Sequence, residues 1–179
     1  MNKFNSLLFT ICFSMLISLS GCAVTPTDDI KIDAEADPKV KFAGYKTYAW
    51  LGSAGILKDP EGKWKQPNFD VDAEIRFLID RELRKRGLTE TDKKPDMLVA
   101  YAMGLNMAAL KIKENPETKQ KMLKNIPKGS LLVILADPKT EYVMWIGRAK
   151  AEVQKNPDTA TIKARLDYAV SQMLKKIPK

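Results

Sequence analysis

The sequence predicts an α+β domain of two layers, in which a largely antiparallel sheet of four to five strands carries two long helices on one face. Two segments space their apolar residues as helices do, each with a single apolar stripe that must be buried against a sheet or another helix. Several shorter runs are rich in β-branched and aromatic residues, or alternate apolar and polar side chains, as strands do.

Two strands are expected at the start of the domain. Residues 30–34 alternate apolar and polar side chains, which is the period of a half-buried strand, and Pro38 ends this run. Residues 45–51 are rich in aromatic side chains and predict a second strand. Residues 52–67 hold three glycines and two prolines, so we expect a loop there.

The first long helix follows this loop. Asp70 or Asp72 can cap its N-terminus, and Gly87 lies where a left-handed C-cap is needed. Charged side chains cover one face of the helix. Four residues at i, i+3, i+4 and i+8 form its apolar face: Ile75, Leu78, Ile79 and Leu83.

A central strand and an insert come next. After a polar link over 89–95, residues 96–103 are apolar on both faces, which is typical of a strand inside a sheet. Residues 106–128 then interrupt the sheet pattern with a basic, methionine-rich segment. Within it, residues 115–117 predict a short helix start with proline in the first turn. Its small apolar face would consist of Met122, Leu123 and Ile126.

The last part of the chain predicts a β-hairpin and a second long helix. Two strand-like runs, 130–136 and 141–153, flank the short polar turn 137–140. The helix is expected to begin near 156–158 and to end at Pro178. Its apolar residues keep helical spacing over about four turns: Ile162, Leu166, Ala169, Val170, Met173, Leu174 and Ile177.

The N-terminus has the form of a lipoprotein leader. Lys3 precedes an apolar run of roughly 13 residues, which fits an export signal and is too short to span a membrane. The run closes on residues 19–22, Leu-Ser-Gly-Cys, which has the shape of a bacterial lipobox. We therefore expect a signal peptide over 1–21, lipidation of Cys22, a tether over 22–29 and a single α+β domain over 30–179. A secretory signal cut elsewhere and a retained membrane helix are the alternatives.

The residue after the cysteine bears on location. An aspartate there would suggest retention in the inner membrane of many Gram-negative bacteria, and the chain has Ala23 instead. We expect a protein that is lipid-anchored to the outer membrane and faces the periplasm. Stable anchoring needs more than one acyl chain, and a lipoprotein cysteine carries two or three, palmitate among them.

The amino-acid composition argues against several kinds of catalytic and metal-binding chemistry. The chain has no histidine, the commonest general base and metal ligand. Its two cysteines, Cys12 and Cys22, belong to the leader and the lipidation site, which leaves no disulfide and no catalytic thiol. With no nucleophile–base pair, phosphate loop or metal-binding pattern, we expect no enzymatic activity, no metal and no cofactor.

The chain is basic. Its net charge is +8, and +7 without Lys3. Such a protein can favour anionic lipid or other acidic surfaces, but the charges are spread along the chain and are interpreted as a solvated surface. Export argues against a nucleic acid as partner.

Four segments resemble a widespread family of uncharacterised Gram-negative lipoproteins that is catalogued only as a domain of unknown function. They are residues 45–50 (Tyr-Lys-Thr-Tyr-Ala-Trp), the 75–88 helix with its Arg-Gly-Leu end, residues 95–99 (Pro-Asp-Met-Leu-Val) and the 129–149 hairpin with its Trp-x-Gly-x-Ala ending. Ile146 stands where an arginine is common, and the 106–128 insert departs most from the pattern. The resemblance implies a periplasm-facing lipoprotein domain and no established activity.

Several side chains are candidate site residues. Asp70, Asp72 and Glu74 could act as acid and base or bind a hard cation, although helix capping and the helix dipole also explain them. Asp137 is a turn residue or a fourth acid. An adaptable apolar surface for a ligand or partner could involve four residues, against plain packing: Met103, Met107, Met122 and Trp145. The other strand aromatics are interpreted as core or as an exposed platform: Tyr48, Trp50, Tyr101 and Tyr142.

Three functions follow. The first is a non-catalytic envelope lipoprotein that binds a protein or another envelope component. The second is a lipid- or transport-associated accessory module with an apolar groove and the 106–128 insert as a lid. The third is a hydrolase, which requires the acids near residue 72 to converge with another acid such as Asp137.

Overall fold

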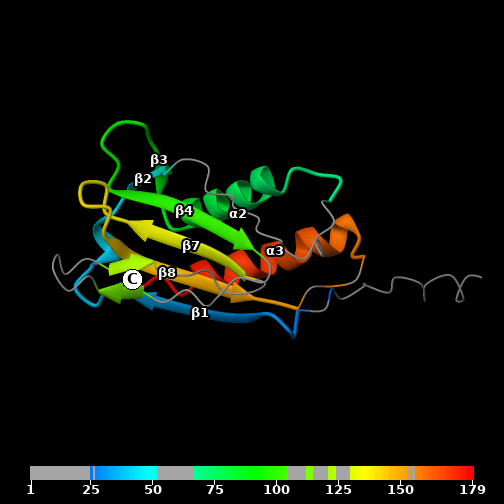
Figure 1. Cartoon of the computed structure of the whole chain (residues 1–179). Helices are drawn as coiled ribbons and strands as arrows, with labels where there is room; N and C mark the ends of the chain where they lie inside the picture. Colours follow the sequence, from blue (N-terminus) through cyan, green and yellow to red (C-terminus); the bar gives the residue numbers. More distant parts are fainter. Residues whose placement is uncertain are drawn as a thin grey trace, which may run out of the picture.

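Residues 25, 27–51, 67–104, 112–114, 121–123, 130–152, 154 and 156–179 are described by a computed structural model of the chain (Figure 1). The predicted signal peptide over 1–21 and the predicted lipidation site Cys22 lie outside these residues. The described part is an α+β fold with a mixed six-stranded sheet in the order β1-β8-β7-β4-β2-β3. Its strands are β1 (Lys31–Ala36), β2 (Thr47–Trp50), β3 (Thr89–Glu90), β4 (Met97–Gly104), β7 (Ser130–Ala136) and β8 (Val143–Lys150).

The sheet is only partly antiparallel. β1 pairs with β8, β8 with β7 and β7 with β4 in antiparallel fashion, while β2 pairs in parallel with both β4 and β3. The α+β class is therefore confirmed, but the predicted sheet of four to five largely antiparallel strands is corrected. Parallel strands require a crossover connection, and the first long helix provides it between β2 and β4.

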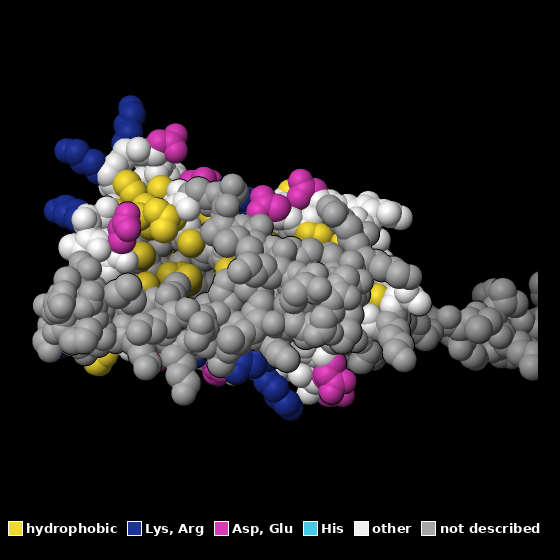
Figure 2. All heavy atoms as spheres, in the orientation of Figure 1, with side chains coloured by type: hydrophobic (Ala, Val, Ile, Leu, Met, Phe, Trp, Pro, Cys, Tyr) yellow, Lys and Arg dark blue, Asp and Glu magenta, His cyan; other side chains and the backbone are white. Residues whose placement is uncertain are grey.

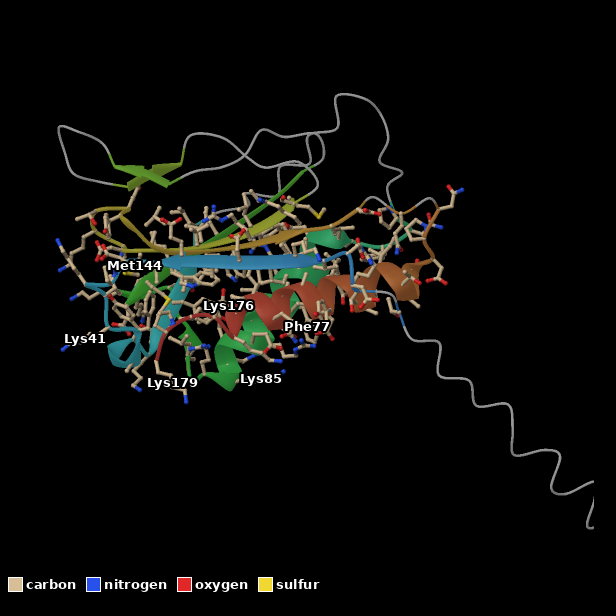
Figure 3. All side chains as sticks on the ribbon, turned by 90° about the horizontal axis from the view of Figure 1, so that it is seen from below. Lys41, Phe77, Lys85, Met144, Lys176 and Lys179 are labelled. Carbon is tan, nitrogen blue, oxygen red and sulfur yellow. The ribbon has the colours of Figure 1, made fainter. Side chains whose placement is uncertain are left out.

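Both long helices were correctly predicted. α2 (Val71–Lys85) begins after Asp70, whose carboxylate accepts a hydrogen bond from the Ala73 N–H at 3.0 Å. α3 (Thr159–Leu174) begins after Asp158, which caps it in the same way through the Thr161 N–H at 2.6 Å. Gly87 adopts the left-handed conformation at φ 80° after α2, as its place in the sequence requires. Figure 3 shows α2 and α3 together on one face of the sheet.

The two helices run in the same direction. Cross-helix contacts join Glu74 to Lys163 near the helix starts and Arg86 to the backbone oxygen of Lys175 near the ends. Figure 1 shows both helices ending at the edge of the domain where β2, β4 and β8 begin. This parallel arrangement brings the C-termini of both helices to one end of the domain.

The core lies between the sheet and the helices. Trp145, Tyr48, Ile75 and Met173 are among its largest fully buried side chains. Gly147 makes this packing possible, because a Cβ there would lie 2.3 Å from Met173 Cγ and 2.3 Å from Trp145 Cη2. A second, smaller cluster of Leu132, Val143 and Ile146 is buried on the other side of the sheet.

Three local features of the structure differ from the sequence predictions. The insert contributes β5 (Ile112–Glu114) paired with β6 (Lys121–Leu123), so the predicted helix across Met122 and Leu123 is wrong. Strand β3 lies within the link predicted as polar coil, and its side chains are exposed, so no apolar pattern marks it. The short 3₁₀ helix η1 (Phe42–Gly44) was not anticipated.

The tight packing at residue 147 yields a prediction. We expect Gly147→Ala to destabilise the fold by about 1–3 kcal/mol, because the added methyl forces Trp145 and Met173 apart. The measurement is urea unfolding followed by tryptophan fluorescence. Gly44→Ala is the matched control, since a Cβ at that position would have no heavy atom within 4 Å. Equal stability of the two variants would contradict the packing role of Gly147.

Candidate functional site

The acidic side chains at the start of α2 each make a separate structural contact. Asp70 caps the helix. Asp72 accepts a hydrogen bond from the Tyr101 hydroxyl and pairs with Arg76 at 3.3 Å. Glu74 pairs with Lys163 of α3 at 2.6 Å. These contacts fit the capping and packing interpretation of the three acids.

Asp137 lies at the other end of the sheet, in the β7–β8 turn (Figure 1). Its Oδ1 accepts hydrogen bonds from the Thr140 hydroxyl and N–H, each at 2.8 Å, and from the Lys139 N–H at 3.0 Å. The Thr140 side chain and the two amides lower the pKa of Asp137. Among the described residues, the convergence of acids that a hydrolase requires is therefore absent.

Two of the four residues suggested for an apolar surface, Trp145 and Met103, face the core. Trp145 is 1% exposed and Met103 packs against the core, because strand alternation turns both toward the helices. Met107 lies outside the described residues, and of Met122 only the backbone in β6 is described. The aromatic residues of β2 also face inward, since the Tyr48 hydroxyl and the Trp50 N–H both donate to Asp80.

A pocket of about 480 Å³ lies where α2 and α3 end. The β1–β2 connection, residues 37–46, passes along this end of the sheet and contributes one side of the pocket. The floor is apolar and comes from five parts of the chain. It consists of Phe42, Leu88, Met97, Leu135, Leu174 and Ile177, all of them buried.

Five cations surround this pocket, and we call them the basic pole: Lys46, Lys85, Arg86, Lys175 and Lys179. Figure 3 shows Lys85 and Lys179 at this end of the domain, together with Lys41 and Lys176 outside the lining. Figure 2, which views the domain from the sheet side, shows further dark blue Lys and Arg side chains at the upper left, where Figure 1 draws the β3–β4 connection. The sequence did not predict the basic pole, because its five side chains come from three separate segments of the chain.

The basic pole combines fixed and free cations. The Arg86 guanidinium donates to the backbone oxygens of Ile177 at 2.7 Å and Lys175 at 3.3 Å, and burial lowers its pKa. Within the described part of the chain, the side chains of Lys46, Lys175 and Lys179 form no hydrogen bond or ion pair and are exposed. Arg86 therefore holds the end of α3 in place, while these three lysines remain available to a ligand.

Glu82 is the one carboxylate side chain in the pocket lining. It is 8% exposed and accepts hydrogen bonds from Arg81 at 2.7 Å, Lys85 at 2.8 Å and Ser171 at 3.1 Å. Burial opposes its ionised form, but these hydrogen bonds outweigh burial and lower the pKa of Glu82. Its charge is thus already balanced, and the rim keeps a positive character.

Asp96 positions Lys46 at the pole. Its Oδ2 accepts hydrogen bonds from the Lys46 N–H at 2.8 Å, the Thr47 N–H at 2.9 Å and the Thr47 hydroxyl at 2.9 Å. These donors, the Lys46 amide first, lower the pKa of Asp96. The contact fixes the start of β2 to the start of β4.

The opposite end of the domain holds the described N-terminal residues. Asp29 forms a two-pronged ion pair with Arg165 of α3, at 2.7 and 2.6 Å, and accepts the Glu152 N–H at 2.9 Å. Arg165 lies ten residues before Lys175, so about 15 Å of helix separates this contact from the basic pole. The described residues that precede β1 therefore contact α3 well before its C-terminal end, where the pocket lies.

Two general features of the described residues bear on possible sites. In the described part of the chain, no three acidic, cysteine or histidine side chains are grouped so that they could hold a metal ion. No helix in that part combines the length and the apolarity needed to cross a membrane.

The fold and these motifs define a class of domain, and comparison with known proteins places the chain within it. The chain belongs to the family described as a domain of unknown function, DUF4136, whose profile matches residues 32–179. This confirms the resemblance stated from the four sequence segments. The family description assigns no enzymatic activity.

One solved structure supports the fold, and others are similar to the chain with lower scores. A DUF4136 family protein from Bacteroides thetaiotaomicron is 8% identical, with a TM-score of 0.55 over 81% of this chain and 96% of that one. The PelC dodecamer from Paraburkholderia phytofirmans is 10% identical, with a TM-score of 0.46 over 80% and 96%. A minor lipoprotein from Acinetobacter baumannii is 9% identical, with a TM-score of 0.35 over 74% and 89%. No curated protein matches the sequence.

The ion pair between Asp29 and Arg165 yields a prediction about how stability depends on pH. Hydrogen bonding to Arg165 lowers the pKa of Asp29 to about 2. The pair therefore stabilises the fold above the unfolded pKa of about 3.9, and the contribution is lost as the pH falls toward 2. We expect Asp29→Asn to cost about 1–2 kcal/mol at pH 7, and the difference from wild type to shrink near pH 2.

Urea unfolding at several pH values measures this difference. Asp28→Asn is the matched control, because the neighbouring Asp28 side chain is exposed and its replacement should leave the free energy of unfolding unchanged. A cost of Asp29→Asn that stays constant from pH 7 to pH 2 would contradict the role of its charge.

Proposed function

We propose that this protein is a non-catalytic, membrane-anchored lipoprotein of the cell envelope whose basic pole binds an anionic envelope component. The observation that carries the proposal is the apolar pocket with five surrounding cations and one neutralised carboxylate. The family membership and the lipobox at Cys22 support the envelope setting. Outer-membrane attachment on the periplasmic side is part of the proposal.

The position of the pole favours a partner away from the anchor. The tether joins the domain near Asp29, while the basic pole lies beyond the far end of α3. At physiological ionic strength, charges are screened over about 8 Å, which is about half of the roughly 15 Å of helix between Arg165 and Lys175. The pole would therefore act on components of the periplasmic space rather than on the head groups beside the anchor.

Helix dipoles alone do not account for the cations. Lys85, Arg86 and Lys175 lie at helix C-termini, where a positive charge is favoured. Lys46 lies at the start of β2, outside any helix, and Lys179 lies beyond the end of α3. Their presence around the same pocket is better explained by a common anionic ligand.

The anchor is tested by mass spectrometry of the purified protein and by its partition into membranes. We expect the mature chain to begin at Cys22 and to carry acyl groups, and Cys22→Ser to abolish both processing and acylation. Cys12→Ser lies within the leader and should leave the mature product unchanged. An unacylated wild-type protein would contradict the anchor.

The binding role is tested by photo-cross-linking in intact cells. A photoreactive side chain replaces Ala43, which is exposed in the pocket lining, or Ala73, which is exposed at the far end. We expect adducts at position 43 that decrease about tenfold in the double variant Lys46→Gln, Lys175→Gln, since each charge contributes roughly 0.5–1 kcal/mol.

Two controls make this result specific. Lys31→Gln with Lys150→Gln removes the same charge from the exposed region near the tether and should change nothing. Adducts that are equal at positions 43 and 73, or that do not respond to loss of Lys46 and Lys175, would contradict the proposal.

A further inference from the structure

We infer that the free edge of β1 is a docking site for the β1 strand of a second copy of this chain, paired antiparallel about a two-fold axis. This inference goes beyond the proposed function and does not depend on the basic pole. Three features of β1 support it: its position in the sheet, its unused backbone groups and the order of its charges.

Strand β1 forms one edge of the six-stranded sheet, since in the described part of the chain it pairs with β8 alone. Figure 1 draws β1 along the lower border of the domain with no described element beyond it, and Figure 3 views this edge directly. Native sheets often protect an edge with a proline or a bulge. β1 has no proline, and its register with β8 runs without a shift over all six residues.

Alternate residues of β1 leave their backbone groups unused. The Asp37 N–H donates to the Met144 oxygen at 2.8 Å, in register with the β1–β8 pairing, which marks a hydrogen-bonded pair. Because such pairs recur at every second residue of an antiparallel ladder, the odd-numbered residues of β1 direct their N–H and C=O groups toward β8. The even-numbered residues direct theirs away from the sheet, and no backbone hydrogen bond joins them to another described residue: Ile32, Ala34 and Ala36.

The side chains of these three residues lie on the helix side of the sheet. They pack against the main core cluster but are only partly buried, because no strand lies beyond them among the described residues. A second β1 strand would cover their open side and gain the free energy of apolar burial. The edge thus offers both backbone groups and apolar side chains to a partner strand.

The charges on the other face of β1 favour a second copy as that partner. Lys31, Asp33 and Glu35 are exposed there, in an order that is complementary to its own reverse. If the two-fold axis passes through residue 33, Lys31 of each copy lies opposite Glu35 of the other. Opposite charges at such cross-strand positions stabilise the pairing.

The same charges select this register over its neighbours. An axis through residue 34 would place Asp33 opposite Glu35 twice, and like charges there are destabilising. An axis through residue 32 would shorten the overlap. In the favoured register the two Asp33 side chains face each other, but Arg148 of the same copy pairs with each of them at 2.7 Å and offsets the repulsion.

The proposed anchor is compatible with this pairing. The two Lys31 residues would lie about 13 Å apart along the strands, and a tether of eight residues reaches at most about 26 Å. Both acylated cysteines can therefore enter one membrane. Confinement to that membrane raises the effective concentration of the two edges.

The test is disulfide cross-linking of the full-length acylated protein in cell envelopes, with copper phenanthroline as oxidant. Asp33→Cys places the two new thiols at the axis, where residues of a non-hydrogen-bonded pair have Cα atoms about 4.5 Å apart, which suits a disulfide. We expect a covalent dimer linked through position 33. Glu35→Cys is the matched control, because its thiols would lie about 13 Å apart along the strands and should not join.

A charge reversal tests the register. Added to Asp33→Cys, Lys31→Glu places an acid opposite Glu35 at both ends of the pairing and should reduce the covalent dimer about tenfold. Lys139→Glu makes the same charge change in the exposed β7–β8 turn and should leave the dimer unchanged. Thermal unfolding of each variant before oxidation confirms that it remains folded.

Equal linking at positions 33 and 35, or a yield that Lys31→Glu does not lower, would show random collision and overturn the paired register. An absence of linking at position 33, or a link to a different protein, would overturn the second copy as the occupant of this edge. Lys46→Gln with Lys175→Gln removes charge from the basic pole and should leave the link unchanged, so this inference and the proposed anion binding are tested separately.

Discussion

The parallel pairing of β2 with β4 is the constraint on which the rest of the structure depends. Because the two strands run the same way, α2 must cross back over the sheet between them. β8 also runs in this direction, since two antiparallel pairings separate it from β4. The helix that follows β8 is therefore parallel to α2, and both C-termini arrive at the same end of the domain. Asp96 fixes this pairing with its three hydrogen bonds to Lys46 and Thr47.

A pair of parallel helices concentrates the negative ends of two dipoles, and basic side chains there relieve the repulsion. Arg86 also forms direct contacts there, because its guanidinium donates hydrogen bonds to backbone oxygens at the end of α3. On the helix faces that meet, Arg81 binds both Glu82 and Asp167, so acids and bases alternate across the contact. The cations not used in this way lie around a pocket whose floor is part of the core. A structural need for positive charge thus coincides with a site suited to an anionic ligand.

Most elements could be predicted from the sequence, and the position of the site could not. Helix spacing, the Asp70 cap and the glycine at 87 give local patterns that the structure reproduces. Gly147 makes room for Trp145 and Met173, a packing requirement that appears only in the structure. Strand β3 has exposed side chains and two residues, so it carries no periodic signal. The insert was predicted as a helix from the placement of a proline, whereas two three-residue strands pair there instead.

The lysines of the basic pole are dispersed in the sequence, and only the direction of the helices brings them together. The basic last turn of α2 and the lysines that follow α3 were the available signal, but interpreting them required knowledge of the parallel β2–β4 pairing.

The most direct test of anion binding at the pole is a lysine-reactivity footprint. Intact envelopes and the purified protein would be treated with an amine-modifying reagent, and modification of each lysine would be followed by mass spectrometry. We expect Lys46, Lys175 and Lys179 to react several-fold more slowly in envelopes, and high salt to remove that protection because it screens the contact. Equal reactivity of these three lysines in envelopes and in the purified protein would contradict anion binding at the basic pole.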